Sequence, residues 1–200
     1  MRRSAPPRLD QLTVPQHPNH VWGVDHKGWI RLGDGSRAEP LTITDGFSRY
    51  LIGVAATGGT APDEARPVFE RAFRQHGLPE VIRSGNGTPF ASTGTAGLTA
   101  LPAWRIKLGI RHERIDPGHP RQNGRHERFH RTLFEAMRPP SADRSAQARW
   151  FKAFATGYNE ERPHQALGQQ TPASVYHPSV RAMPRRLPEP SYPAETAVRR

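Results

Sequence analysis

Residues 21–57 read VWGVDHKGWIRLGDGSRAEPLTITDGFSRYLIGVAAT. Apolar and polar residues alternate over residues 21–32, and two further strand-like stretches follow at about 39–45 and at 49–56. The Asp-Gly pair at residues 34–35 is a hairpin signal between the first two stretches. Because strands joined by turns this short must run antiparallel, the segment predicts a three-stranded antiparallel meander.

Helical and strand patterns alternate in the rest of the chain. The predicted elements are helices over 61–76 and 96–108, short strands over 80–83 and 109–115, and helices from 120 or 123 to 137 and over 142–158. A strand reached by a helical crossover must lie parallel to the first strand. This order predicts a ribonuclease-H-like α/β fold, with a mixed five-stranded sheet flanked by helices.

The charge of the chain favours a polyanionic partner. Its 200 residues suit one domain with tails, and 29 Lys and Arg against 18 Asp and Glu give a net charge of +11. Nucleic acid is the first partner that this surplus suggests, an anionic membrane surface the second, and a merely basic protein is the remaining alternative. The sequence has no apolar run long enough to span a membrane and no apolar stretch of a secretory signal. It also lacks cysteine, which excludes disulfides, thiolate catalysis and cysteine-ligated zinc.

Five segments carry a family resemblance. They are VWGVDHKG at 21–28, TITDGFSRYL at 42–51, VIRSGNGTPF at 81–90, PGHPRQNGRHER at 117–128, and YNEERPHQAL at 158–167 followed by TPAS at 171–174. In this order they resemble the integrase-core transposases of bacterial insertion sequences, the branch of the DDE superfamily related to retroviral integrases. The resemblance covers about residues 20–190. It implies DNA transposition and DNA integration by phosphodiester cleavage and strand transfer, acting on transposon ends and target DNA.

Asp25 and Glu127 are the candidate catalytic and metal-ligating residues. A carboxylate inside a buried strand, as Asp25 is expected to be, is costly unless a metal or a partner neutralises it; the alternative is a salt bridge to Lys27 or an arginine. Glu127 falls early in a predicted helix, where an ion pair with Arg131 is the alternative. The resemblance implies two Mg²⁺ or Mn²⁺ ions here, and Mg²⁺ prefers oxygen ligands. Such a pair, about 4 Å apart, activates the nucleophile and stabilises the leaving oxygen.

Gly85 stands where the resemblance implies the third ligand, an aspartate that bridges both ions. Glycine has no side-chain oxygen, so the two-metal site is not expected to assemble normally. Ser84 and Asn86 are neutral and should face away, and Glu113 and Asp116 are the other nearby carboxylates in sequence. The sequence therefore predicts a transposase core with impaired catalysis. An inactive remnant that only binds DNA or oligomerises is the alternative, and a general ribonuclease-H-like nuclease is a weaker one.

Basic residues near Glu127 are the candidate DNA contacts. Their expected role is to contact phosphates and bases, and a solvated basic helix face is the alternative. The set comprises Lys27, Arg121, Asn123, Arg125 and Arg128. On the same predicted helix, Phe129, Leu133, Ala136 and Met137 should form the apolar face. His126 and His130 lie four residues apart, and a surface or DNA-facing role is favoured over zinc because no third ligand is evident.

Composition divides the chain into three expected parts. They are a basic, Pro-rich arm over 1–19, an integrase catalytic core over 20–178, and a Pro-rich tail over 179–200 that is expected to be truncated. The resemblance implies a helix-turn-helix region before the core, for which the 24 residues before Asp25 leave no room. Largely nonspecific, salt-sensitive DNA binding is therefore expected. The resemblance also implies a homo-oligomer on DNA, no membrane partner, and a cytoplasmic, nucleoid-associated location.

Overall fold

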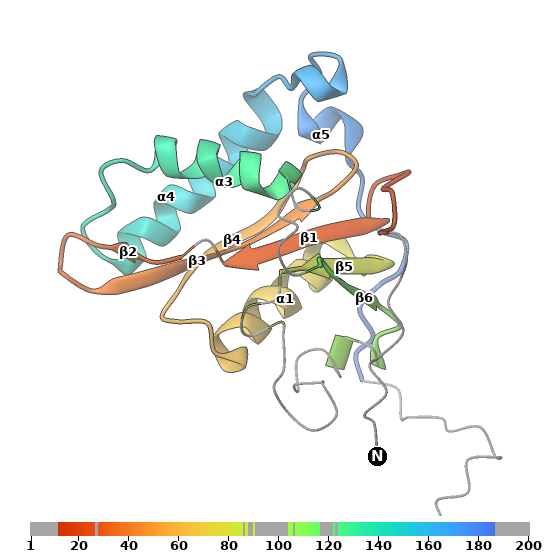
Figure 1. Cartoon of the computed structure of the whole chain (residues 1–200), viewed down its shortest axis with the longest axis horizontal. Coiled ribbons are helices and arrows are strands. Elements are labelled where there is room, and N and C mark those ends of the chain that lie inside the picture. Colours follow the sequence, from red (N-terminus) through yellow and green to blue (C-terminus); the bar gives the residue numbers. More distant parts are fainter. Residues whose placement is uncertain are drawn as a thin grey trace, which may run out of the picture.

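A mixed sheet forms the centre of the protein (Figure 1). The computed structural model describes residues 12–26, 28–85, 87, 90, 104–105, 107–116, 122 and 124–186. Six strands form the sheet within these residues: β1 (Val21–His26), β2 (Ile30–Arg31), β3 (Arg37–Asp45), β4 (Leu51–Thr57), β5 (Val81–Ser84) and β6 (Arg111–Arg114). Their order is β2-β3-β1-β5-β6, and β4 pairs with the other edge of β3. As predicted, β1, β3 and β4 are antiparallel, while β5 lies parallel to β1.

The sheet has one strand more than predicted, because the first predicted strand is divided in two. Gly28 has a φ of 70°, a region that glycine enters easily and other residues rarely do, so the chain turns after β1. β2 then pairs with β3 across the predicted hairpin. Within that hairpin the amide of Leu32 donates to the carbonyl of Ser36 at 2.9 Å.

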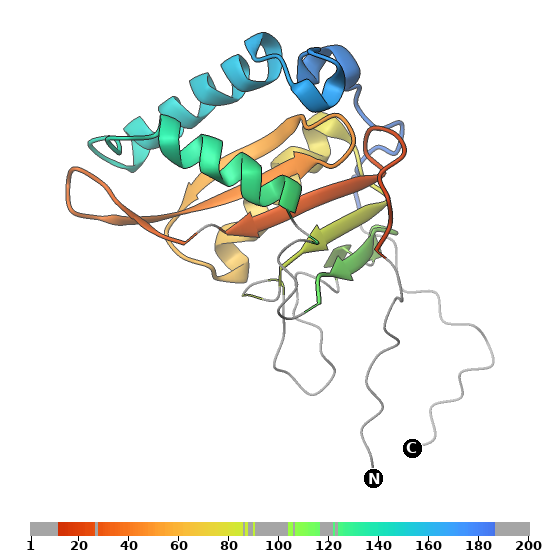
Figure 2. The same cartoon turned by 45° about the horizontal axis from the view of Figure 1, so that its top comes forward.

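Helices cover both faces of the sheet (Figure 2). They are α1 (Pro62–His76), α3 (Gly124–Ala136), α4 (Arg144–Thr156), α5 (Pro172–Val175), a π-helix at Gly157–Glu161 and a 3₁₀ turn at Gln165–Leu167. α1 lies on one face, and α3 and α4 lie on the other. The helix predicted over 96–108 falls mostly outside the described residues.

The two faces of β1 belong to different environments. Trp22 and Val24 point toward α1 and join a core that includes Phe69 and Phe73. Asp25 points the other way, because successive strand residues alternate between faces. On that side Phe129, Leu133 and Met137 of the α3 segment are buried as predicted, but Ala136 is exposed, so the apolar stripe is narrower than expected.

The described parts of both ends pack against the core. Thr13 is hydrogen-bonded to Glu113 on β6, and the backbone amide of Leu78 donates to the carbonyl of Arg181 at 2.7 Å. The side chain of Arg181 also donates to the carbonyl of Pro79. Among the described helices, none combines the length and apolarity that a bilayer crossing requires.

Candidate active site

Asp25, Glu127 and His130 meet at the end of β1. One ligand atom from each residue lies within 4.8 Å of the other two. Asp25 is the fifth residue of β1, while Glu127 and His130 are three residues apart on α3 and so lie on adjoining parts of one helix face. The carboxylates are partly buried and the imidazole is fully buried. Within the described part of the chain, this is the group of acidic and histidine side chains that could hold a metal ion.

Gly85 lies directly beside this group. β5 is paired in parallel with β1, with Ser84 opposite Val24, so residue 85 follows next to Asp25. A Cβ built on Gly85 would lie 3.5 Å from Oδ1 of Asp25 and would meet no other atom within 4 Å. The backbone of Gly85 does not have the positive φ that would exclude a side chain. An aspartate at this position would therefore point its carboxylate at Asp25, and the fold itself does not require glycine there.

The prediction that His126 and His130 face the surface or DNA is wrong. Both are buried, with exposed fractions of 2% and 0%. Nε2 of His126 lies 2.7 Å and Nε2 of His130 lies 2.8 Å from the hydroxyl of Thr42, and Nδ1 of His126 lies 3.0 Å from that of Thr44. Exposed arginines alternate with buried residues along this helix, so the sequence did not reveal that His126 and His130 are buried. The spacing of three residues from Glu127 was the signal for His130, since it places both on one side of a helix.

The hydroxyl of Thr42 determines which nitrogens of the two histidines carry protons. It donates to the backbone carbonyl of Asp25 at 3.2 Å. A hydroxyl has one proton and two lone pairs, so when that proton is donated to the carbonyl of Asp25 both imidazoles donate to the hydroxyl from Nε2. In neutral His130 the lone pair is then on Nδ1, the arrangement found in metal-binding histidines whose second nitrogen is held by a hydrogen bond.

Gly23 allows α3 to lie this close to β1. A Cβ on Gly23 would lie 3.0 Å from Nδ1 of His126 and 3.4 Å from the hydroxyl of Thr44. The missing side chain thus leaves room for His126, which in turn sets the position of His130 one helical turn later. Close approach of two elements is a common reason for glycine within a strand.

The other polar groups near the site form hydrogen bonds or ion pairs with residues outside it. Glu113 is buried and lies 2.9 Å from Nη2 of Arg83, and it also accepts from Thr13. Burial opposes ionisation of Glu113, but the hydrogen bonds from Thr13 and Arg83 outweigh burial and lower its pKa. The hydroxyl of Ser84 lies 2.8 Å from Nε2 of His112, and Asp116 is bonded to Gln122. Asn86 lies outside the described residues.

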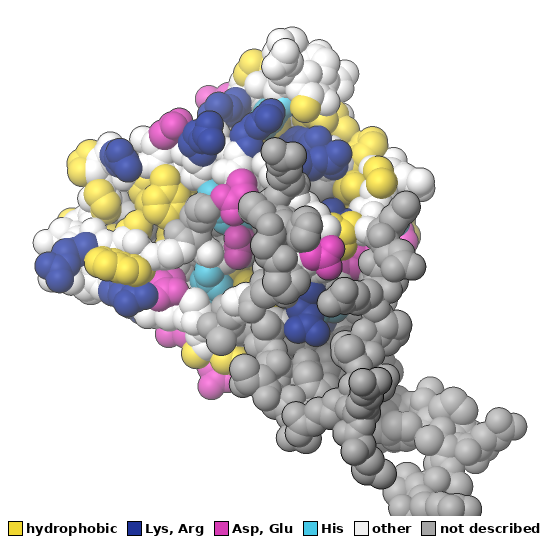
Figure 3. Space-filling view, viewed as in Figure 1, with side chains coloured by type: hydrophobic (Ala, Val, Ile, Leu, Met, Phe, Trp, Pro, Cys, Tyr) yellow, Lys and Arg dark blue, Asp and Glu magenta, His cyan; other side chains and the backbone are white. Residues whose placement is uncertain are grey.

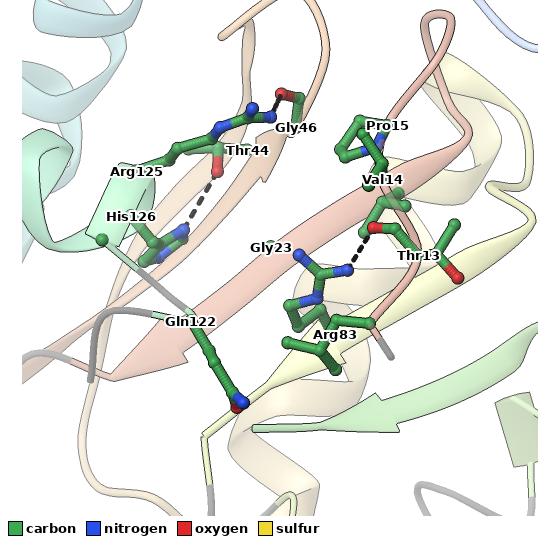
Figure 4. Close-up of a pocket in the computed structure, with 13 residues that line it drawn as sticks. Thr13, Val14, Pro15, Gly23, Thr44, Gly46, Arg83, Gln122, Arg125 and His126 are labelled. Atoms are coloured by element: carbon green, nitrogen blue, oxygen red, sulfur yellow. Dashed lines mark hydrogen bonds between the residues drawn. The ribbon is translucent and has the colours of Figure 1, made fainter. Parts of the chain in front are cut away.

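A small hollow opens next to the site, between α3 and the segment before β1 (Figure 4). Its volume is about 270 Å³. Residues 13–15 border one side and His126 the other, with Gly23 between them. Arg83 and Arg125 contribute guanidinium groups to its lining from β5 and α3, and Arg83 is ion-paired with Glu113.

The predicted DNA-contacting residues are only partly described. Arg125 and Arg128 are exposed on α3, and Nη1 of Arg125 donates to the carbonyl of Gly46 at 2.9 Å. Lys27, Arg121 and Asn123 lie outside the described residues. Figure 3 shows acidic and histidine side chains near the middle of this face, with Lys and Arg gathered above them over the helical layer.

Sequence comparisons identify the family of the chain. Two profiles described as Integrase core domain match residues 15–120 and 108–172. An uncharacterized 31.7 kDa protein of insertion element IS407 from Burkholderia multivorans is 28% identical over 174 residues, covering 82% of this chain and 57% of that protein. An uncharacterized 39.2 kDa protein of insertion element IS476 from Xanthomonas euvesicatoria is 28% identical over 82% of this chain and 46% of its own length. The chain thus spans about half the length of these curated relatives.

Solved structures show the same fold. A chain of a simian T-cell lymphotropic virus intasome, solved in complex with PP2A regulatory subunit B56 gamma, has a TM-score of 0.65 at 21% identity, covering 92% of this chain and 61% of that chain. The HTLV-2 integrase catalytic core domain in complex with magnesium has a TM-score of 0.57 at 18% identity, covering 82% and 99%. The ribonuclease-H-like prediction is therefore confirmed. The chain belongs to the integrase core domain family, and its fold and sequence are those of a transposase or integrase catalytic core.

Proposed function

We propose that this chain is the core of a DNA transposase whose metal site is incomplete, so that it binds DNA but catalyses phosphodiester transfer poorly. The convergence of Asp25, Glu127 and His130 within 4.8 Å, with Gly85 open beside them, carries the proposal. This chain spans about half the length of its curated relatives, so the activity of the whole protein is part of the proposal.

The donor set fits one divalent ion. Asp25 and Glu127 offer the oxygens that Mg²⁺ and Mn²⁺ accept, while the imidazole of His130 favours a transition-metal ion over Mg²⁺. A bound divalent ion would activate water or a 3′-hydroxyl and polarise the scissile phosphate. Asp25, Glu127 and His130 would hold the ion, and Thr42 would orient His130 from behind.

Gly85 limits the site to fewer ligands than the family pattern implies. An aspartate there would add a full negative charge and one or two oxygens next to Asp25. Without it, no carboxylate among the described residues is available to a second ion in this direction, because Glu113 and Asp116 are engaged with Arg83 and Gln122. The alternative function, a remnant that only binds DNA or self-associates, is favoured by the same glycine.

DNA is the proposed partner. The net charge of +11 and the exposed Arg125 and Arg128 beside the site support it, and Lys27, Arg121 and Asn123 are proposed to contribute. Self-association on DNA is proposed because integrase relatives occur as a dimeric form, a trimeric form and an intasome. A DNA partner would place the chain at the nucleoid.

The test compares the parent with Gly85→Asp in nicking and strand transfer on duplex DNA with Mg²⁺ or Mn²⁺. We expect the parent to bind duplex DNA without cleaving it, and Gly85→Asp to cleave. Adding Asp25→Ala to the second protein should abolish the gain. Robust cleavage by the parent that Asp25→Ala removes would overturn the proposed impairment.

A further inference from the structure

A second basic surface lies on the outer side of α3. It is a hollow of about 620 Å³, which we call the arginine hollow, lined by Arg49, Arg125, Arg128, Phe129, Thr132, Tyr158, Arg162, Pro163, His164, Gln165 and Ala166. On α3, residues 125, 128 and 132 share one side of the helix, and Glu127 points to the opposite side because of the 3.6-residue period. The hollow is therefore distinct from the site at Asp25 and Glu127 but adjoins it, because Arg128 also lines a surface depression together with Glu127.

Four guanidinium groups share this space without a carboxylate among the described lining residues. Arg49 and Arg125 donate to the same acceptor, the carbonyl oxygen of Gly46, at 2.7 and 2.9 Å. None of the four arginines forms an ion pair with a described carboxylate. The charge of Asp45 raises the pKa of Arg49, but Asp45 is buried and its carboxylate accepts hydrogen bonds from Asn19, Phe47 and Ser48.

The electrostatics of the hollow reflect this crowding. Burial and the neighbouring Arg125 lower the pKa of Arg49. Burial, Arg162 and Arg49 lower the pKa of His164. Like charges held together are relieved by a bound anion, and a guanidinium binds phosphate in a planar, two-point geometry.

Parts of the chain that are distant in sequence build the hollow and hold it in place. Asn159 joins the π-helix to the edge of β4, because its side chain accepts from the amide of Leu51 at 2.8 Å and donates to the carbonyl of Leu51 at 3.1 Å. The ring of Tyr158 packs against Phe129 and His164, with centroid distances of 5.2 and 5.0 Å. The segment YNEERPHQAL is thereby docked so that Arg162 lies beside the arginines of α3.

We propose that the arginine hollow binds the phosphate backbone of duplex DNA, with Arg49 and Arg162 as phosphate contacts in addition to the residues of α3. This rests on the proposed DNA-binding function and deepens it. One duplex can span the two places, because Arg128 borders both the arginine hollow and the surface that Glu127 lines. Phosphates on one side of α3 can then occupy the hollow while those on the other side reach the carboxylates. The hollow contributes affinity and orientation rather than chemistry.

The experiment measures duplex DNA affinity of the full chain across a salt series. Arg49→Gln with Arg162→Gln is compared with Arg49→Lys with Arg162→Lys. The matched control is Arg71→Gln with Arg74→Gln, an equal loss of charge from exposed positions on α1. We expect the hollow Gln pair to bind about tenfold more weakly and to lower the slope of log K against log salt by about 2, since each phosphate contact contributes about 0.9. The Lys pair should keep most of the slope, and the α1 pair should match the parent.

Three other results would overturn the proposal. If the parent binds DNA and the hollow Gln pair matches the α1 pair, the hollow is not the site, although DNA binding stands. If the parent does not bind DNA, the proposed function itself fails. If the hollow Gln pair loses binding to single-stranded RNA or to heparin while duplex binding is unchanged, the hollow belongs to another polyanion.

Discussion

A Cβ added to Gly85 would lie 3.5 Å from Oδ1 of Asp25, and the backbone of Gly85 would accept a side chain without strain. The position is therefore suited to a ligand that the chain does not have. The two residues are neighbours because β5 runs parallel to β1, with Ser84 opposite Val24. The consequence for metal binding can be measured apart from any reaction.

Gly85→Asp should increase the affinity for Mn²⁺ and Mg²⁺ by tenfold or more, because it adds a charged ligand beside Asp25. Without metal, the same variant should lose about 1–3 kcal/mol of unfolding free energy through repulsion between the two carboxylates. Titration calorimetry and urea unfolding would measure the two effects. The control is Gly85→Asn, which adds similar volume without charge. Equal affinities for the Asp and Asn variants would contradict a role for charge at this position.

His130→Asn should weaken Mn²⁺ binding by tenfold or more, and it should weaken Mg²⁺ binding less because Mg²⁺ prefers oxygen ligands. His126→Asn is the matched control, since His126 is equally buried and also hydrogen-bonded to Thr42 but does not belong to the metal-binding group. Both variants should lower the unfolding free energy by about 1–3 kcal/mol through lost buried hydrogen bonds. A similar loss of Mn²⁺ affinity in both would indicate a general disturbance of α3 instead of ligation.

Gly23→Ala should destabilise the protein by about 1–3 kcal/mol, because its Cβ would press on the imidazole of His126 at 3.0 Å. Thermal unfolding would detect this change. Gly59→Ala is the control, since a Cβ there meets nothing within 4 Å and the backbone of Gly59 has no positive φ. An unchanged melting temperature in the Gly23 variant would mean that α3 moves without cost.

Local patterns in the sequence were sufficient for most of the fold. The antiparallel meander and the parallel β5 follow from turn signals and crossover rules, and the structure confirms both. The division of the first strand was not predicted, because it depends on the conformation of Gly28, which a sequence pattern does not specify.

The site was harder to predict because burial is a tertiary property. Asp25 and Glu127 stood out through their segments, and the structure brings them together. A surface or DNA-facing role was predicted for His130 because no third metal ligand was evident in the sequence, whereas in the structure His130 is buried and lies next to Asp25 and Glu127. Likewise, Arg49 and Arg162 lie more than 100 residues apart, and only the docking of Asn159 on Leu51 places them in one hollow.

The docking of Asn159 should itself be measurable. Asn159→Ala removes two hydrogen bonds to the backbone of Leu51 and leaves the amide and carbonyl of that residue to find other partners. We expect a loss of about 2–4 kcal/mol in unfolding free energy, together with weaker DNA binding if the arginine hollow loses its shape. Glu161→Ala, an exposed substitution in the same π-helix, is the control. Equal stability of the two variants would contradict a role of Asn159 in holding the π-helix to β4.

His112 should make the protein sensitive to mild acid. Burial, together with Arg105 and Arg114, lowers the pKa of His112 to about 3, well below its ordinary value of 6.5. At pH values between 3 and 6.5, His112 is protonated in the unfolded chain but not in the folded chain. The unfolding free energy should therefore fall as the pH decreases below 6.5, by at most about 1.4 kcal/mol per pH unit. Urea unfolding at pH 7, 6 and 5 would measure the slope, and His112→Asn should flatten it while His177→Asn, at an exposed position, should not. An unchanged slope in His112→Asn would show that the acid sensitivity comes from other groups, such as His26, His76 and His164, whose pKa values burial also lowers.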